Sequence, residues 1–102
     1  MRDMKDFKDI QEIRKLIDEI DFHILKLFSD RSRCVKEIVR FKNDKTEIIA
    51  KKRQRELIEV RREWAENLNL DPDLFEKFFK MLIKSNIQKE LKMLEQKESG
   101  NK

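Results

Sequence analysis

The sequence predicts an all-α protein with three helices, one of them very long. Two observations lead to this expectation: apolar residues recur at steps of three and four, and the 102 residues include one glycine and one proline. The glycine, Gly100, lies among the last three residues, so a glycine-rich phosphate loop, a nucleophile elbow and a tight hairpin turn are excluded. We therefore expect neither a nucleotide-binding fold nor a β-rich one.

The first helix is expected from about Phe7 to about Lys42. One face carries an apolar series at steps of three and four: Ile10, Ile13, Ile17, Ile20, Ile24 and Leu27. The same step continues to Arg31, Cys34, Ile38 and Phe41. A helix of this length must pack along its whole length. A domain of this size buries only about two thirds of its unfolded surface, so a second chain is expected. The predicted assembly is a dimer built on antiparallel first helices.

Two more helices follow. A turn over residues 43–46 is expected to precede a second helix that begins near Ile49, carries an apolar face and is closed by Asn69 in a left-handed conformation. That face comprises Leu57, Val60 or Arg61, Trp64 and Leu68. Asp71 followed by Pro72 is a helix start signal, and it predicts a third helix to about Leu94. Its face carries Phe75, Phe79, Leu82 and Leu94.

Charge and composition indicate which classes of partner to expect. The 25 basic and 21 acidic residues give a net charge of +4 and alternate along most of the chain, which indicates a modest attraction for anions. The basic run at 51–55 has no accompanying aromatic or glycine element, so no nucleic-acid partner is expected. No stretch reaches the roughly 18 uncharged residues that span a bilayer, so we expect no membrane partner and a cytoplasmic location.

One cysteine and one histidine predict neither a disulfide nor a metal site, and no cofactor is expected. The predicted organisation is a flexible N-terminus over residues 1–8, one helical domain over 9–95 and a disordered tail over 96–102.

Polar residues stand where the first helix calls for apolar ones. Arg31 falls on the apolar face, where a charge is costly unless it is paired or meets a ligand. Lys42 lies 11 residues later, on nearly the same face and ~16 Å along the axis. The two cations are expected either to form interhelical ion pairs or to hold a small dianion between them.

The third helix repeats this pattern. Asn86 and Glu90 continue the inward register of Phe79 and Leu82, which predicts either a polar pocket or a structural salt bridge. Arg14 lies ~25 Å before Arg31 along the first helix, so it can reach the same small ligand only from an antiparallel second copy. Such a dimer would have shared sites.

These residues resemble a known family, the all-helical (type II) chorismate mutases. The resemblance to the first helix of that family lies in Ile13-Arg14, Ile17-Asp18-Glu19-Ile20-Asp21, Leu27 with Arg31, and Arg40-Phe41-Lys42. It extends over about Asp9 to Leu94. Further segments look most like the isochorismate-pyruvate lyase branch: Val35-Lys36, Arg40-Phe41-Lys42, Ile48, Ala50, Arg53, Trp64-Ala65-Glu66 and Leu70-Asp71.

The resemblance implies an intertwined dimer of three-helix chains that rearranges chorismate to prephenate without a cofactor, in the shikimate pathway of aromatic amino-acid biosynthesis. It implies that Arg31 and Arg14 of the partner subunit hold the two substrate carboxylates. Lys42 would contact a carboxylate and the ether oxygen. Glu90 matches the position at which a glutamine usually faces that oxygen.

The chain departs from the family at the ring hydroxyl. Family members usually carry an acidic residue near the start of the second helix and an Arg-Glu pair, whereas the gap-free register places Ala50 and Arg53-Gln54 there. A two-residue shift would bring in Arg55-Glu56 instead. The choice between chorismate and isochorismate stays open. The expected substrate-binding set is Arg14, Arg31, Lys42, Arg53, Gln54, Asn86 and Glu90.

The first interpretation is a chorismate mutase with Arg14, Arg31, Lys42 and Glu90 as catalytic residues. A pericyclic reaction needs no nucleophile, base or metal, which is compatible with this composition. The alternatives are an isochorismate-pyruvate lyase that forms salicylate, and a non-catalytic helical dimer in which Arg31, Asn86 and Glu90 only fix helix register.

Overall fold

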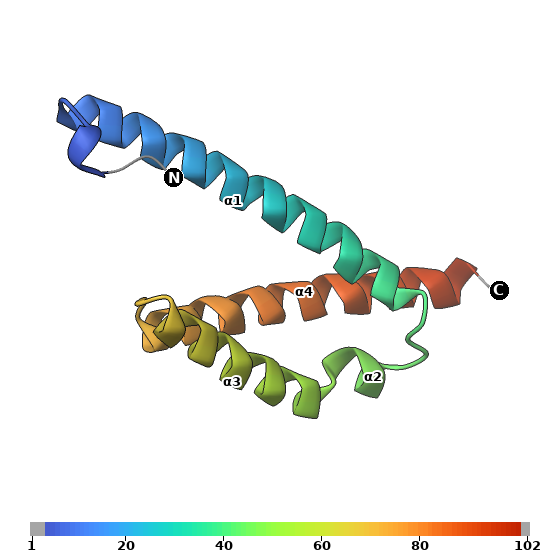
Figure 1. Cartoon of the computed structure of the whole chain (residues 1–102). Helices are drawn as coiled ribbons and strands as arrows, with labels where there is room; N and C mark the ends of the chain where they lie inside the picture. Colours follow the sequence, from blue (N-terminus) through green and yellow to red (C-terminus); the bar gives the residue numbers. More distant parts are fainter. Residues whose placement is uncertain (1–3, 101–102) are drawn as a thin grey trace. The chain divides into compact units, whose positions relative to one another are not determined.

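The structure, a computed structural model, describes residues 4–100. It contains a 3-10 turn η1 (Met4–Asp6) and the helices α1 (Ile10–Val39), α2 (Lys45–Ile49), α3 (Lys51–Asn67) and α4 (Pro72–Gly100) (Figure 1). Every regular element of the described residues is helical, so the all-α prediction is confirmed; the three predicted helices correspond to α1, α3 and α4, and the short α2 was not predicted. None of these helices is both long enough and apolar enough to cross a bilayer.

Helix α1 has 30 residues and is shorter at both ends than expected. Its start follows Asp9, whose carboxylate accepts a hydrogen bond from the Glu12 backbone N–H at 2.9 Å, the contact of an N-cap. At the other end, the N–H groups of Phe41 and Lys42 bond to carbonyls only three residues back, at 2.9 and 3.2 Å. The last turn is tightened, and Lys42 lies just beyond the helix.

The segment after α1 differs from the expected turn over 43–46. Asp44 caps α2 by accepting a hydrogen bond from the Glu47 N–H at 2.9 Å, while the Glu47 side chain accepts one from the Asn43 N–H at 2.6 Å. These reciprocal contacts favour helix from Lys45 onward. Ala50 then interrupts the helix in the left-handed region, with φ 42°, and α3 begins at the next residue.

The expected start of α4 is confirmed. Asp71 accepts a hydrogen bond from the Asp73 N–H at 2.9 Å, and Pro72 is the first helical residue. Asn69 adopts the left-handed conformation with φ 60°, as expected. The helix continues to Gly100, whereas the predicted end was about Leu94 and a disordered tail was expected from residue 96. Residues 1–3 and 101–102 of the expected flexible ends lie outside the described part of the chain.

The chain divides into two compact units, Met1–Cys34 and Val35–Lys102, and each is described by itself. In the second unit, α3 and α4 lie side by side (Figure 1). Their shared core comprises Leu57, Ile58 and Ile83, with Phe79 and Ile87 packed against it.

The buried face of α3 is rotated from the predicted one. Ile58 and Ala65 are buried, whereas Trp64 and Leu68 are 53% and 69% exposed in the single chain. Leu57 is buried as expected. The predicted face therefore identified one edge of the contact with α4 rather than its centre.

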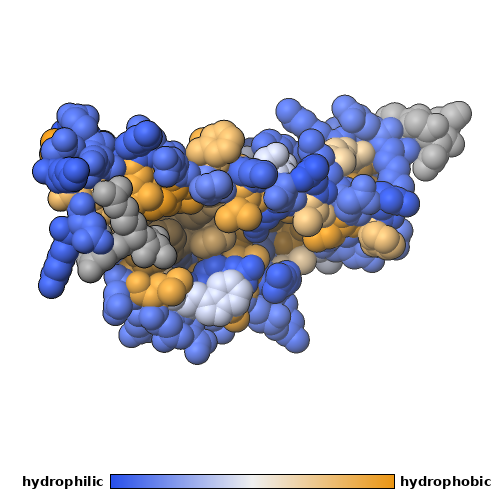
Figure 2. All heavy atoms as spheres, turned by 45° about the horizontal axis from the view of Figure 1, so that its top comes forward, coloured by the Kyte–Doolittle hydropathy of each residue, from blue (hydrophilic) through white to orange (hydrophobic). Residues whose placement is uncertain are grey.

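In the first unit, most apolar residues of α1 are exposed. The exposed members of the predicted apolar face within α1 include Ile10, Ile13, Ile17, Ile24 and Leu27. Figure 2 shows apolar side chains that reach the surface between charged ones. In a single chain, this face of α1 leaves apolar area in contact with water.

Candidate active site

Lys42 and Glu90, two of the predicted catalytic residues, lie against each other in the second unit. Lys42 follows the end of α1, and Glu90 projects from α4. The Lys42 Nζ atom is 3.7 Å from Glu90 Oε2 and also donates a hydrogen bond to the backbone carbonyl of Ile48 at 3.4 Å. The ammonium group is therefore held between the end of α2 and the side of α4.

Glu90 is the only charged residue that is buried among the described residues. Burial raises the pKa of its carboxyl group above the usual value, because desolvation penalises the ionised form, and the nearby Lys42 ammonium opposes part of that shift. When ionised, Glu90 can only accept hydrogen bonds and attracts Lys42. When protonated, it can donate a hydrogen bond to a ligand oxygen. Lys42 and Glu90 thus offer one cation and one group that changes from acceptor to donor with pH.

Asn86 and Gln54 are the polar, uncharged members of the predicted site, and both are half-buried. Asn86 lies one helical turn before Glu90 on α4. Gln54, in the first turns of α3, donates a hydrogen bond through Nε2 to the backbone carbonyl of Ile49. Since the Ile48 and Ile49 carbonyls belong to adjacent peptides, Lys42 and Gln54 are anchored to the same end of α2.

The two possible registers at the start of α3 differ in exposure. Arg55 and Glu56 are exposed, and Glu56 forms an i,i+4 ion pair with Lys52 at 4.0 Å. Arg53 is exposed too, whereas Gln54 is half-buried and bonded to α2. In the single chain, Gln54 of the gap-free register is therefore more shielded than Glu56 of the shifted one.

The two remaining predicted residues, Arg14 and Arg31, lie on α1 within the unit Met1–Cys34. Arg14 is exposed, and Arg31 is half-buried. The contacts of the second unit therefore bring together Lys42 and Glu90, and the end of α2 links Lys42 to Gln54. The proposed roles of the two arginines stay predictions.

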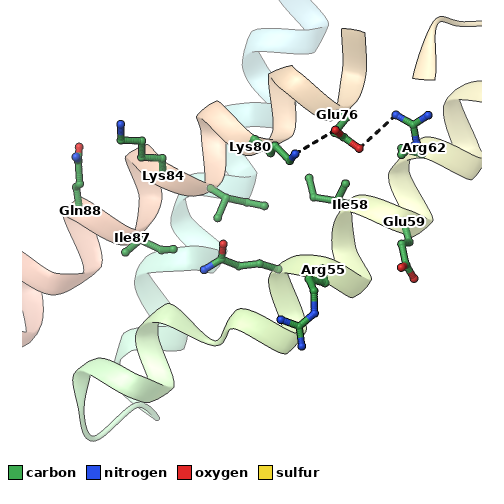
Figure 3. A pocket seen from close by; sticks show the side chains of 11 residues that line it. Arg55, Ile58, Glu59, Arg62, Glu76, Lys80, Lys84, Ile87 and Gln88 are labelled. Atoms are coloured by element: carbon green, nitrogen blue, oxygen red, sulfur yellow. Dashed lines mark hydrogen bonds and ion pairs between the residues drawn. The ribbon is translucent and has the colours of Figure 1, made fainter. Parts of the chain in front are cut away.

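A groove of 590 Å³ lies between α3 and α4, and the sequence did not indicate it (Figure 3). One end is closed by ion pairs that join Arg62 to Glu76 at 3.3 Å and Glu76 to Lys80 at 3.1 Å. In Figure 3, the labelled ends of Arg55 and Lys84 point away from the groove. Two of its cations, Arg62 and Lys80, are paired with Glu76, and its lining also includes Gln54 and the apolar side chains of Ile58, Ile83 and Ile87.

The apolar and polar pattern of the sequence did not indicate the two backbone acceptors at the end of α2. The signal was present in Asp44-Lys45-Thr46-Glu47, an acid followed three residues later by glutamate, which is typical of a helix start. Recognising this short helix would have placed its last carbonyls near Lys42.

Comparisons with known proteins point to one family. Residues 13–91 match the family described as "Chorismate mutase type II". The chain is 33% identical over 94 residues to the chorismate mutase of Methanocaldococcus jannaschii, covering 91% of this chain and 95% of that protein. It is 32% identical over 92 residues to the isochorismate pyruvate lyase of Pseudomonas aeruginosa, covering 90% and 91%. The chain belongs to the type II chorismate mutase family.

Proposed function

We propose that the protein is a chorismate mutase, which rearranges chorismate to prephenate without a cofactor. The observation that carries this proposal is the Lys42 ammonium group 3.7 Å from the buried Glu90 carboxyl group, in a chain of this family. The substrate is a dianion, and a positively charged chain with a cation held at a shielded position suits it.

The reaction breaks the ether C–O bond while a C–C bond forms, and negative charge develops on the ether oxygen. Donors that already point at this oxygen stabilise the transition state more than the ground state. In the proposed mechanism Lys42 donates to the ether oxygen and to a carboxylate, and protonated Glu90 donates to the ether oxygen from the other side. No proton needs to be transferred, so neither group acts as a base.

Arg31 and Arg14 of the partner subunit are proposed to bind the two substrate carboxylates and to hold the compact conformer that reacts. Asn86, Arg53 and Gln54 are proposed to complete the site near the ring hydroxyl. Gln54 has an acceptor oxygen for a hydroxyl proton, and Asn86 lies one turn from Glu90.

A homodimer with shared sites is part of the proposal. The exposed apolar face of α1, with Ile10 at 58% and Leu27 at 66%, supports it, because an antiparallel second copy would cover this face. The same arrangement would carry Arg14 of the partner subunit toward the site. The expected cytoplasmic location stays a prediction.

Isochorismate-pyruvate lyase activity is the second candidate. The 32% identity to the Pseudomonas aeruginosa lyase favours it, and so does the neutral Gln54 where mutases usually carry an acid. Glu90 counts against it, since a minority of mutases have a glutamate at this position. A non-catalytic dimer is the third candidate, in which the Lys42 and Glu90 pair only fixes helix packing.

The test is to incubate the purified protein separately with chorismate and with isochorismate. Loss of chorismate absorbance with formation of prephenate supports the mutase, and release of salicylate and pyruvate from isochorismate supports the lyase. If neither substrate is consumed above the uncatalysed rate, the non-catalytic interpretation stands and the proposal is wrong.

A further inference from the structure

The end of α2 presents two backbone carbonyls that side chains occupy. Helix ends leave their last carbonyls without partners inside the helix. Here α2 stops because Ala50 turns into the left-handed region. The Ile48 carbonyl accepts a hydrogen bond from Lys42 Nζ at 3.4 Å, and the Ile49 carbonyl accepts one from Gln54 Nε2.

We propose that Gln54 is a positioning residue for Lys42. By donating a hydrogen bond to the Ile49 carbonyl, Gln54 fixes the joint between α2 and α3, and this joint aims the neighbouring Ile48 carbonyl at the Lys42 ammonium group. The catalytic consequence rests on the proposed function, but the structural link does not.

Burial explains why this joint has one arrangement. Ile48 is 2% exposed and is the most deeply buried side chain among the described residues. Helix α2 packs on α4, the helix that carries Glu90. A rotation of the joint would therefore move the Ile48 carbonyl relative to Glu90, and Lys42 would lose one of its two partners.

The amide of Gln54 has two separable functions. The carbonyl of Ile49 can only accept, so the NH₂ group of Gln54 must face it. The Oε1 atom remains available to accept a hydrogen bond from a substrate hydroxyl. Positioning thus depends on the donor atom, whereas direct substrate binding depends on the acceptor atom.

Two variants separate these functions. Gln54→Glu keeps the side-chain length and the acceptor oxygen but, when ionised, repels the Ile49 carbonyl. Gln54→Met keeps the length and loses both atoms without adding a charge. Gln88→Glu, an exposed glutamine on α4 with no hydrogen bond among the described residues, is the matched control for added charge.

We expect kcat/KM for chorismate to fall about tenfold in both Gln54 variants, equivalent to ~1.4 kcal/mol in the barrier, and to stay near wild type in Gln88→Glu. If Gln54→Glu retains wild-type activity while Gln54→Met loses it, Gln54 acts through its acceptor on the substrate and the inference is wrong.

A second readout needs no substrate. Lys42 is the charged group in contact with Glu90, and the neighbouring Asn86 is neutral, so a displacement of the Lys42 ammonium group changes how strongly it opposes the effect of burial on the pKa of Glu90. A ¹³C NMR titration of the Glu90 carboxyl should show a pKa in Gln54→Met that differs from the wild-type pKa. A purely structural role would lower the melting temperature and leave this pKa unchanged, which would overturn the inference.

The two readouts also separate the two proposals. If the wild type converts no chorismate, the proposed function fails, and the NMR titration still tests the link. If the variants do not fold, the link is tested by hydrogen exchange in the wild type. A Gln54 side-chain N–H bonded to the Ile49 carbonyl should exchange slowly with solvent. Fast exchange of both Gln54 side-chain protons would contradict the link.

Discussion

The Lys42 ammonium group lies 3.7 Å from the Glu90 carboxylate, with 21% of the Lys42 side chain and 8% of the Glu90 side chain exposed. A shielded ion pair seldom stabilises a fold more than apolar residues of the same size would, since both groups lose water. Removing one partner is costly, because the other charge remains buried alone. An arrangement of this kind suits a site in which a dianion competes for the cation.

Replacement of Lys42 should remove most of the activity. We expect Lys42→Met to lower kcat by at least about 10²-fold, the loss typical of one donor to a developing oxyanion. Steady-state kinetics with chorismate measure this. Lys84→Met is the matched control, because Lys84 is an exposed lysine of α4 without an ion pair among the described residues. Equal activity of the two variants would remove Lys42 from the mechanism.

The left-handed conformation of Ala50 makes a separate prediction about stability. A residue with a Cβ atom is strained at φ 42°, and glycine is not. Ala50→Gly should therefore raise the free energy of unfolding by about 1 kcal/mol, less the greater entropy of glycine in the unfolded chain. Urea denaturation of both proteins measures the difference. Ala65→Gly is the control, because Ala65 lies buried in α3 and its replacement should destabilise.

The contrast between α4 and α2 shows what the sequence could predict. Asp71-Pro72 acts through local chemistry, a cap and a fixed φ angle, so the start of α4 was predictable. The inward positions of Asn86 and Glu90 followed from helical period, and both are shielded in the structure. The break at Ala50 was not predictable, because alanine normally favours helix and tertiary burial of the neighbouring Ile48 outweighs that preference.

The site was predictable only in part for a similar reason. Periodicity along one helix places a residue on a face, but it does not specify which backbone atom on another element meets that residue. Lys42 and Glu90 were found as polar interruptions of apolar faces. The Ile48 and Ile49 carbonyls carry no signal in their side chains, and their role depends on the short helix between Lys42 and α3.

The exposed face of α1 predicts that the folded protein is an obligate dimer. An antiparallel second copy would remove the apolar residues of both α1 helices from water. In the single chain these residues stay exposed. Sedimentation equilibrium at micromolar concentration should give twice the mass of one chain, which is 12.5 kDa. The unfolding midpoint should also depend on protein concentration. A folded monomer under these conditions would contradict the dimer.

Shared sites predict recovery of activity on subunit exchange. If Arg14 and Arg31 serve one site from two chains, Arg14→Ala and Arg31→Ala should each be nearly inactive. Mixed dimers of the two variants should contain one site with both native arginines and regain part of the wild-type activity. The measurement is chorismate consumption after exchange, with mixed dimers verified by native mass spectrometry. Mixed dimers without activity would place the two arginines in the same chain's site or outside it.

The protonation of Glu90 predicts a pH dependence with a definite sign. Activity should be highest when Glu90 is protonated and able to donate to the ether oxygen, and it should decline as pH rises through its pKa. Burial raises that pKa above 4.5, so the decline begins above the range of an exposed glutamate. Glu90→Gln donates at every pH, and its kcat/KM should stay flat where the wild type declines.

The free energy of unfolding should also fall as pH rises. Because the pKa of Glu90 is higher in the folded chain than in the unfolded one, the wild type should lose stability relative to Glu90→Gln as pH rises between the two values. Kinetics and urea denaturation from pH 4 to 9 test both statements. Identical activity profiles for the two proteins would show that Glu90 does not face the breaking bond, and a constant stability difference would show that its pKa is the same in the folded and unfolded chains.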